Sequence, residues 1–163
     1  MKPVHLSITV GRPREEVFDY LADIANHPEF TDHYLVDWRL TREESSGLGA
    51  GARFRLEAPL NRFGWADMTL IEVESPSRIV MAGQTGKFNR VRTLTTYALD
   101  SSADGQTQVD FEVETKPVLP SDRLMEKIGR PWFARNAKKG LKRLRSILED
   151  DRKRGARATI AGR

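Results

Sequence analysis

A chain of 163 residues can form one domain that buries about 70% of the surface its unfolded form exposes. Its net charge is +4, and it contains 39% hydrophobic residues and no cysteine, which excludes disulfides and thiolate metal sites. No apolar run approaches the roughly 20 residues that span a bilayer, and residues 1–3 lead into a strand pattern rather than a signal peptide. We therefore expect a soluble, cytoplasmic protein.

The first part of the sequence predicts a strand followed by two short helices. Residues 4–10 are apolar at every second position, as in a half-buried strand. A helix begins near Pro13, since proline is favoured in the first helical turn. The Asn-His-Pro sequence at 26–28 breaks this helix, and residues 28–30 begin a second helical turn.

About six further strands of antiparallel type follow the two helices. Within 65–74 the alternating apolar residues fall on even positions up to Leu70 and on odd positions from Ile71. This change predicts a β-bulge or burial on both faces. The loop 59–64 places Leu60 and Phe63 where they look exposed. Alternating apolar residues predict strands over 34–40, 54–58, 65–74, 91–99 and 109–113, and the continuous apolar run 79–82 predicts another.

A long helix ends the predicted domain. Pro131 predicts a kink or a restart near Arg130, because proline lacks the backbone N–H. A single helix laid across a curved sheet tends to enclose a space, so the order of elements predicts a protein that holds a small apolar molecule. Residues 121–151 repeat apolar side chains at helical spacing, namely Leu124, Ile128, Phe133, Ala137, Leu141, Leu144 and Leu148.

Positive charge is concentrated at the end of the sequence. Residues 135–163 contain eleven Lys or Arg against three acidic residues, and 152–163 contain five cations and no acid. Such a segment has little apolar area to bury, so we expect 152–163 to be a basic, disordered tail after a domain over 1–151. The charges favour a solvated helix face, with peripheral contact to an anionic membrane as an alternative. No aromatic residue lies among the charges after Phe133, so no nucleic acid partner is expected.

Three segments carry a recognisable pattern: 13–23 (PREEVFDYLAD) with 26–30 (NHPEF), 49–54 (GAGARF) and 71–80 (IEVESPSRIV). They resemble the START-like, Bet v 1-like (SRPBCC) superfamily, specifically its polyketide cyclase/dehydrase-type branch, over roughly residues 3–150. The resemblance implies an α+β helix-grip fold, with a seven-stranded antiparallel sheet wrapped around a long C-terminal helix and two short helices after the first strand. None of the matching residues is a catalytic signature, so the resemblance assigns no active-site residue.

The candidate ligand site is the inner face of the sheet together with the helix. Thr93, Thr95 and Tyr97 share one parity and would offer hydroxyls to a ligand, unless they face solvent as ordinary strand residues. Gly140 costs about 1 kcal/mol relative to alanine inside a helix, which suggests that it leaves room. The predicted lining is Phe54, Leu56, Met68, Leu70, Met81, Thr93, Thr95, Tyr97, Phe111, Val113, Phe133, Asn136, Ala137, Gly140, Leu141 and Leu144.

Asp67, Tyr97 and His33 are the candidates for acid–base chemistry. Asp67 lies among apolar residues; facing inward it would be neutral and able to donate a proton, and facing outward it would be a solvated charge. His33 is either a residue at the pocket mouth or a surface turn histidine. The acids and histidines around His27 lie where the fold needs a turn, so neither a metal nor a cofactor is expected.

Three functions stay open from the sequence. The first is a carrier or binding protein for a hydrophobic small molecule such as a lipid, an isoprenoid or a polyketide. The second is an enzyme, a polyketide cyclase or dehydratase that acts in the same cavity. The third is an interaction module that docks through its basic C-terminal helix and tail.

Overall fold

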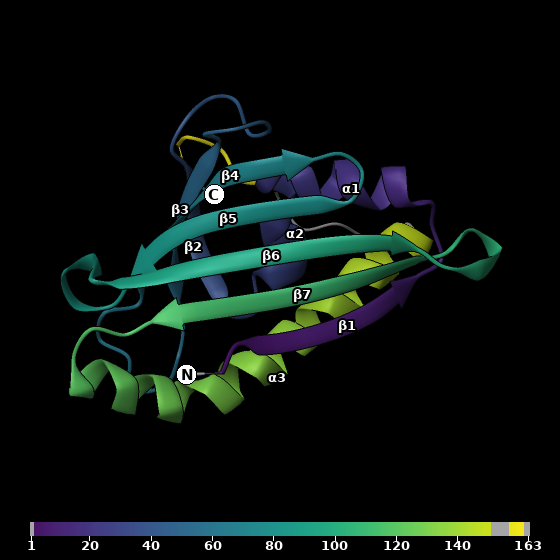
Figure 1. Ribbon diagram of the computed structural model, residues 1–163. Helices are drawn as coiled ribbons and strands as arrows, with labels where there is room; N and C mark the ends of the chain where they lie inside the picture. Colours follow the sequence, from purple (N-terminus) through teal and green to yellow (C-terminus); the bar gives the residue numbers. More distant parts are fainter. Residues whose placement is uncertain (1, 151–156, 162–163) are drawn as a thin grey trace.

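One antiparallel sheet forms the body of the protein in a computed structural model that describes residues 2–150 and 157–161 (Figure 1). The described residues form seven strands in the spatial order β1-β7-β6-β5-β4-β3-β2, and each neighbouring pair is antiparallel. This confirms the predicted sheet. The strands are β1 (Val4–Val10), β2 (Leu35–Leu40), β3 (Gly51–Leu56), β4 (Trp65–Glu74), β5 (Arg78–Thr85), β6 (Val91–Ser101) and β7 (Thr107–Lys116).

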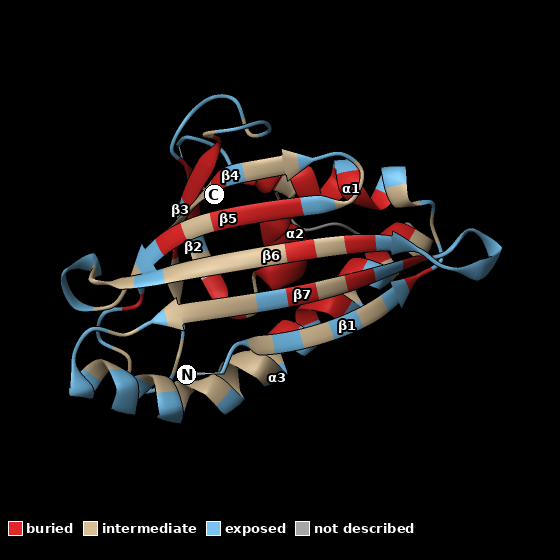
Figure 2. Cartoon of the chain, in the orientation of Figure 1, coloured by how far each residue is buried: buried red, intermediate tan, exposed pale blue. Residues whose placement is uncertain are grey.

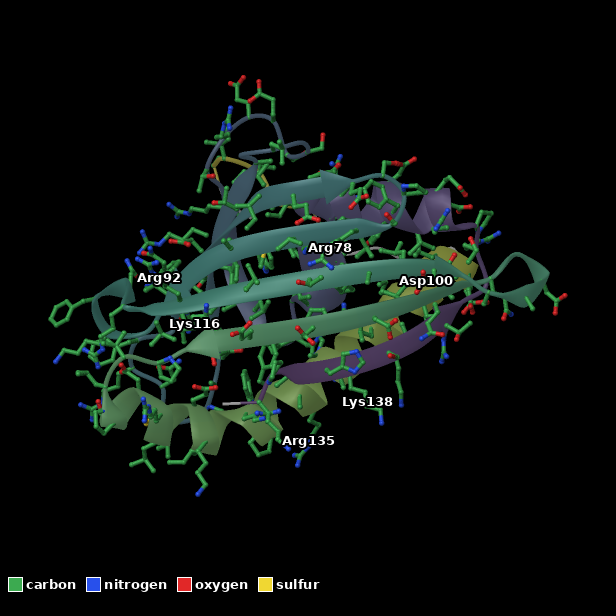
Figure 3. The ribbon with its side chains drawn as sticks, in the orientation of Figure 1. Arg78, Arg92, Asp100, Lys116, Arg135 and Lys138 are labelled. Atoms are coloured by element: carbon green, nitrogen blue, oxygen red, sulfur yellow. The ribbon has the colours of Figure 1, made fainter. Side chains whose placement is uncertain are left out.

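The helices gather on one face of this sheet. Figure 1 shows α1 (Arg14–Ala22), α2 (His27–Thr31) and the second half of α3 (Pro120–Asp150) behind the strands. Charged side chains occupy the opposite face (Figure 3), among them the exposed Arg78, Arg92 and Lys116. Short 3-10 turns complete the described chain, η1 (Ile24–Asn26), η2 (Lys87–Asn89) and η3 (Ala103–Gly105).

Of the kink or restart predicted near Arg130, the restart is not found, because α3 continues through Pro131. Figure 1 shows the axis of α3 changing direction between its first turns and the remainder. A proline inside a helix removes one hydrogen bond and crowds the preceding turn, so a bend in place of a break is a physically ordinary result.

The apolar stripe of α3 divides into two parts. Four of its residues in the second half are buried against the sheet and α2: Ala137, Leu141, Leu144 and Leu148. In the first half, Leu124 and Ile128 are 58% and 55% exposed, so the stripe is not buried along its whole length (Figure 2). The helix keeps its apolar spacing there, but the sheet does not come close enough to cover it.

Two bulges adjust which side chains face inward. The change of register between Leu70 and Glu72 on β4 confirms the predicted irregularity. A second shift, on β2 around Asp37 (φ 56°), makes Leu35 and Trp38 buried residues. The simple alternation expected over 34–40 is therefore wrong.

The chain's last described segment, 157–161, lies beside β2. Leu40 N donates to Thr159 O at 2.9 Å, and Ala158 N donates to Ala25 O at 3.0 Å. Ala158 is buried by this contact. The expected disordered tail thus has one placed portion, whereas 151–156 and 162–163 lie outside the described residues. Among the described helices, none is long and apolar enough to cross a membrane.

Candidate ligand-binding cavity

A cavity of about 750 Å³ lies between the inner face of the sheet, α2 and the first half of α3. This volume is within the range of small-molecule sites. Strand residues in its wall are Val4, Leu35, Trp38, Phe54, Leu56, Ala66, Asp67, Met68, Met81, Thr85, Val91, Thr93, Thr95, Tyr97, Phe111, Val113 and Thr115. The helices and the segments beside them contribute, among others, His27, Thr31, Tyr34, Met125, Glu126, Ile128, Gly129, Trp132 and Phe133.

The predicted lining residues separate by location. Ten of them line the cavity: Phe54, Leu56, Met68, Met81, Thr93, Thr95, Tyr97, Phe111, Val113 and Phe133. Six do not, namely Leu70, Asn136, Ala137, Gly140, Leu141 and Leu144. Five of these six belong to the second half of α3, which packs directly on α2 and β1. Their positions are corrections to the predicted site, because direct packing leaves no space for a guest.

Gly140 leaves room for another helix rather than for a ligand. A Cβ at this position would lie 3.1 Å from the carbonyl oxygen of Phe30 in α2. That distance is tighter than ordinary van der Waals contact, so glycine allows α3 and α2 to approach closely. The prediction that Gly140 leaves room for a ligand is therefore wrong, because the glycine serves helix packing.

Aromatic rings and one imidazole form the deep end of the cavity. The His27 ring lies 6.0 Å from Tyr97 and 6.4 Å from Trp38 between centroids, and Trp38 stacks on Phe54 at 4.5 Å. His27 Nε2–H donates to Leu21 O at 2.8 Å. Burial lowers the pKa of His27, so the ring is neutral and its Nδ1 is an acceptor.

The phenol groups of Tyr34 and Tyr97 are hydrogen-bond donors that complement the acceptor nitrogen of His27. Burial raises the pKa of Tyr34 above its ordinary value, and burial raises the pKa of Tyr97 further, assisted by the neighbouring Tyr34 and Tyr20. Both hydroxyls therefore keep their protons across the physiological range. Tyr34 also packs edge-on against Phe133 at 6.0 Å, which joins α3 to this group.

Charged side chains occur toward the first turns of α3. Thr115 Oγ1 donates to Glu126 Oε1 at 2.5 Å, while Glu126 Oε2 is buried without a partner among the described residues. Arg90 holds Asp122 through two nitrogens at 2.9 and 2.6 Å. These hydrogen bonds from Arg90, with one from Leu119 N, lower the pKa of Asp122 to about 2. The ion pair joins the β5–β6 loop to α3.

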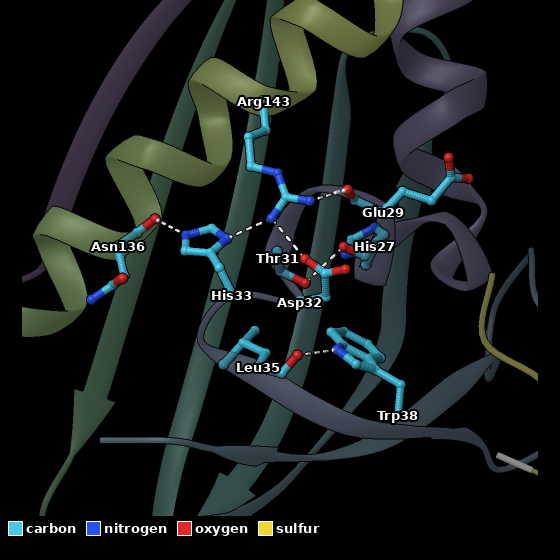
Figure 4. A network of polar contacts seen from close by, with 9 residues as sticks. All are labelled: His27, Glu29, Thr31, Asp32, His33, Leu35, Trp38, Asn136 and Arg143. Carbon is cyan, nitrogen blue, oxygen red and sulfur yellow. Dashed lines mark hydrogen bonds and ion pairs between the residues drawn. The ribbon is translucent and has the colours of Figure 1, made fainter. Parts of the chain in front are cut away.

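His33 lies outside the cavity, in a polar network between α2 and α3 (Figure 4). Arg143 donates to Asp32 Oδ1 at 2.7 Å, to His33 Nδ1 at 2.9 Å and to Glu29 O at 3.2 Å. His33 Nε2–H donates to Asn136 O at 3.0 Å. The ring thus joins α3 to the residues that follow α2, and of the two alternatives open from the sequence, a position at the pocket mouth is not found.

Asn136 and Asp67 also have local partners. Asn136 Nδ2 donates to Trp132 O, one turn earlier in α3, at 2.9 Å. Asp67 contributes to the cavity wall, but its Oδ1 accepts from Gln84 N on β5 at 3.0 Å. Its neighbours on β4, Ala66 and Met68, point toward the inner face of the sheet. Side chains alternate along a strand, so the Asp67 carboxylate points toward the outer face. Of the three acid–base candidates, Tyr97 is the one whose side chain is buried at the cavity.

The described residues contain no group of three His, Asp or Glu side chains placed to hold a metal ion. The segment 27–33 comes nearest to a metal-binding pattern in the sequence, but its two histidines have separate roles. His27 lines the cavity and donates to Leu21 O, whereas His33 lies outside the cavity and accepts from Arg143.

We expect stability to fall at acidic pH because of His27. Its folded-state pKa lies below the 6.5 of an exposed histidine, so below pH 6.5 the unfolded chain binds a proton that the folded protein does not. The contribution is complete above pH 6.5 and is lost as pH falls through the folded-state pKa, by at most about 2 kcal/mol down to about pH 5.

The variant His27→Gln keeps an N–H donor for Leu21 O but does not titrate. Urea unfolding at about pH 6.5 and about pH 5 should therefore show that the free energy of unfolding falls less on acidification in His27→Gln than in the natural chain. His5→Gln, at an exposed position of β1, is the control for the loss of a histidine side chain elsewhere in the fold. Equal acid losses in all three proteins would contradict this role of His27.

A seven-stranded antiparallel sheet that grips a long C-terminal helix defines the helix-grip, Bet v 1-like class of proteins. The chain belongs to the family described as polyketide cyclase / dehydrase and lipid transport, whose model matches residues 1–149. This confirms the family resemblance carried by the sequence segments. No curated protein matches the chain.

Solved structures agree with this fold at low identity. Truncated norcoclaurine synthase from Thalictrum flavum is similar with a TM-score of 0.69 and 13% identity, over 91% of this chain and 94% of that one. Major latex-like protein 151 from Panax ginseng is similar with a TM-score of 0.63 and 10% identity, over 89% and 95% of the two chains. At these identities the likeness establishes the fold alone.

Proposed function

We propose that this protein binds a hydrophobic small molecule, such as a lipid, an isoprenoid or a polyketide-like compound, in the cavity beneath β3–β7. The observation that carries the proposal is a hollow of about 750 Å³ whose wall consists mainly of aromatic and aliphatic side chains. Affinity would come from burial of apolar surface, worth about 25 cal/mol per Å². The neutral hydroxyls of Tyr34 and Tyr97 and the imidazole of His27 would orient the ligand.

Filling the cavity should abolish binding. Thr95 lines the cavity from β6, so in Thr95→Trp the indole would occupy the ligand's volume. The fluorescent apolar probe N-phenylnaphthylamine should bind the natural chain and bind Thr95→Trp at least about ten-fold more weakly. Fluorescence titration measures both affinities.

Thr96→Trp is the matched control for this experiment. Thr96 is the next residue of β6 and has the opposite parity, outside the cavity wall. It should bind the probe like the natural chain. A natural chain that binds no probe, or two tryptophan variants with equal affinity, would contradict the proposed function.

A cyclase or dehydratase acting in the same cavity is the second candidate. It is favoured by the neutral donors and acceptor at the deep end, because rearrangement of a reactive carbonyl chain needs such groups close to the bound substrate. Norcoclaurine synthase has a similar fold, so a fold of this kind can carry a synthase. Tyr97→Phe should then keep probe affinity within about two-fold while it abolishes turnover of a poly-β-ketone thioester.

A further inference from the structure

Exposed apolar side chains gather around the opening of the cavity. We call residues 58–65, 86–90 and 117–130 the mouth rim. Three large exposed apolar side chains of the described chain lie elsewhere, at Leu48, Ile71 and Ile160. The mouth rim holds nine, among them Leu60 at 85% and Phe88 at 84% exposure. An apolar concentration of this kind on one part of a surface indicates a contact site.

Several contacts show that the three segments form one surface. Residues from all three line the same cavity. Lys87 Nζ lies 5.7 Å from the centre of the Phe63 ring, which joins the first segment to the second. The ion pair between Arg90 and Asp122, with its shortest N–O distance at 2.6 Å, joins the second segment to the third. The mouth rim is therefore continuous.

The mouth rim is also positively charged. Its six cations, Arg62, Lys87, Arg90, Arg123, Lys127 and Arg130, stand against the two carboxylates of Asp122 and Glu126. Asp122 is neutralised by Arg90, and Glu126 accepts from Thr115. The cations in excess are interleaved with the apolar side chains, which favours a partner that offers negative charge above hydrocarbon.

The two most exposed apolar residues of the mouth rim occupy loop tips with unusual backbone. Leu60 has φ 63° and Phe88 has φ 58°, a region that favours glycine or asparagine. A leucine and a phenylalanine are costly there both in backbone strain and in exposed apolar area. Strain of this type concentrates at functional sites.

We propose that the mouth rim docks on an anionic lipid bilayer, inserting Leu60 and Phe88 among the acyl chains while its lysines and arginines contact lipid phosphates. Six of the nine apolar side chains are aliphatic. That composition suits hydrocarbon better than the stacked bases of a nucleic acid, which require aromatic platforms. Docking in this orientation places the cavity opening against the membrane. The proposal rests on the proposed function in that the cargo would then pass between bilayer and cavity without crossing water.

Vesicle sedimentation tests the proposal. The natural chain should sediment with vesicles of phosphatidylcholine and phosphatidylserine, and much less with phosphatidylcholine alone. Raising salt from about 0.1 M to about 1 M shortens the Debye length from about 10 Å to about 3 Å and should weaken the binding. The double variant Leu60→Asp/Phe88→Asp should bind the anionic vesicles at least about ten-fold more weakly.

Leu48→Asp/Ile71→Asp is the matched control, because it removes two exposed apolar side chains away from the mouth rim. It should bind anionic vesicles like the natural chain. Three results would overturn the proposal: no binding of the natural chain to anionic vesicles, equal losses in both double variants, or binding to an oligonucleotide in place of vesicles.

The same proteins are titrated with N-phenylnaphthylamine. Leu60 lines the cavity and Phe88 does not, so the single variant Phe88→Asp is the informative one. Probe binding that persists in Phe88→Asp while vesicle binding is weakened supports separate docking and cargo sites. A natural chain that binds vesicles but no probe would overturn the proposed cargo function and leave the docking surface supported.

Discussion

Replacing Gly83 by alanine should destabilise the protein by about 3 kcal/mol or more. A Cβ at position 83 would lie 2.0 Å from the carbonyl oxygen of Asp67 and 2.9 Å from Thr93 Oγ1. Gly83 is paired with Met68 on β4 and with Thr93 on β6, so the sheet cannot yield on either side without breaking hydrogen bonds. Urea unfolding of Gly83→Ala against the natural chain measures the loss.

Gly129→Ala provides the control of opposite sign. Gly129 lies in α3, and a Cβ there would meet no other atom within 4 Å. Alanine should therefore stabilise the protein by about 0.5 to 1 kcal/mol, since it restricts the unfolded chain and suits a helix. Equal stabilities of the two variants would show that close approach at Gly83 is not what the strand requires.

Leu144→Ala should cost about 2 to 5 kcal/mol of unfolding free energy. Leu144 in the second half of α3 is 0% exposed, so the missing methyl groups would leave a void in close-packed surroundings. Because Leu144 does not line the cavity, the folded variant should bind N-phenylnaphthylamine with the natural affinity. Thermal or urea unfolding, followed by probe titration below the transition, measures the two effects.

Leu124→Ala in the same helix is the comparison for Leu144→Ala. Leu124 is 58% exposed, so its truncation should change stability by no more than about 0.5 kcal/mol. A large loss in Leu124→Ala, or a weakened probe affinity in Leu144→Ala, would contradict the division of α3 into a cavity-facing first half and a packed second half.

The sequence is sufficient to predict the sheet, the helices and their order. Alternation over β1 and β7 is nearly uninterrupted, because each of these strands has one buried face and one polar face. The parity change on β4 even located its bulge. The second bulge, around Asp37 on β2, gave no comparable signal, since apolar residues occur on both faces of that strand.

The site could be predicted only in part, because periodicity tells which side chains face inward but not whether another element fills the space before them. Thr93, Thr95 and Tyr97 face the cavity, while Leu141 and Leu144 are buried in the second half of α3, which packs on α2 and β1. The difference depends on where α3 approaches the sheet, and Gly140 sets that approach through Phe30 O.

Other cavity residues were missed for a related reason. His27 and Tyr34 lie in or beside α2, a helix of five residues that is too short to carry a periodic pattern. Trp132 lies next to the predicted Phe133 and contributes to the same wall. A large aromatic residue adjacent to the apolar stripe was the signal that could have indicated it.

The segment 157–161 beside β2 has a consequence for association between molecules. A strand at the border of a sheet offers free amides and carbonyls to any other chain, the usual start of cross-strand polymerisation. Leu40 N is already occupied by Thr159, and at the opposite border Arg130 donates to Lys2 O and Pro3 O. One main-chain donor of β2 and two carbonyls just before β1 are therefore withdrawn from pairing with a second chain.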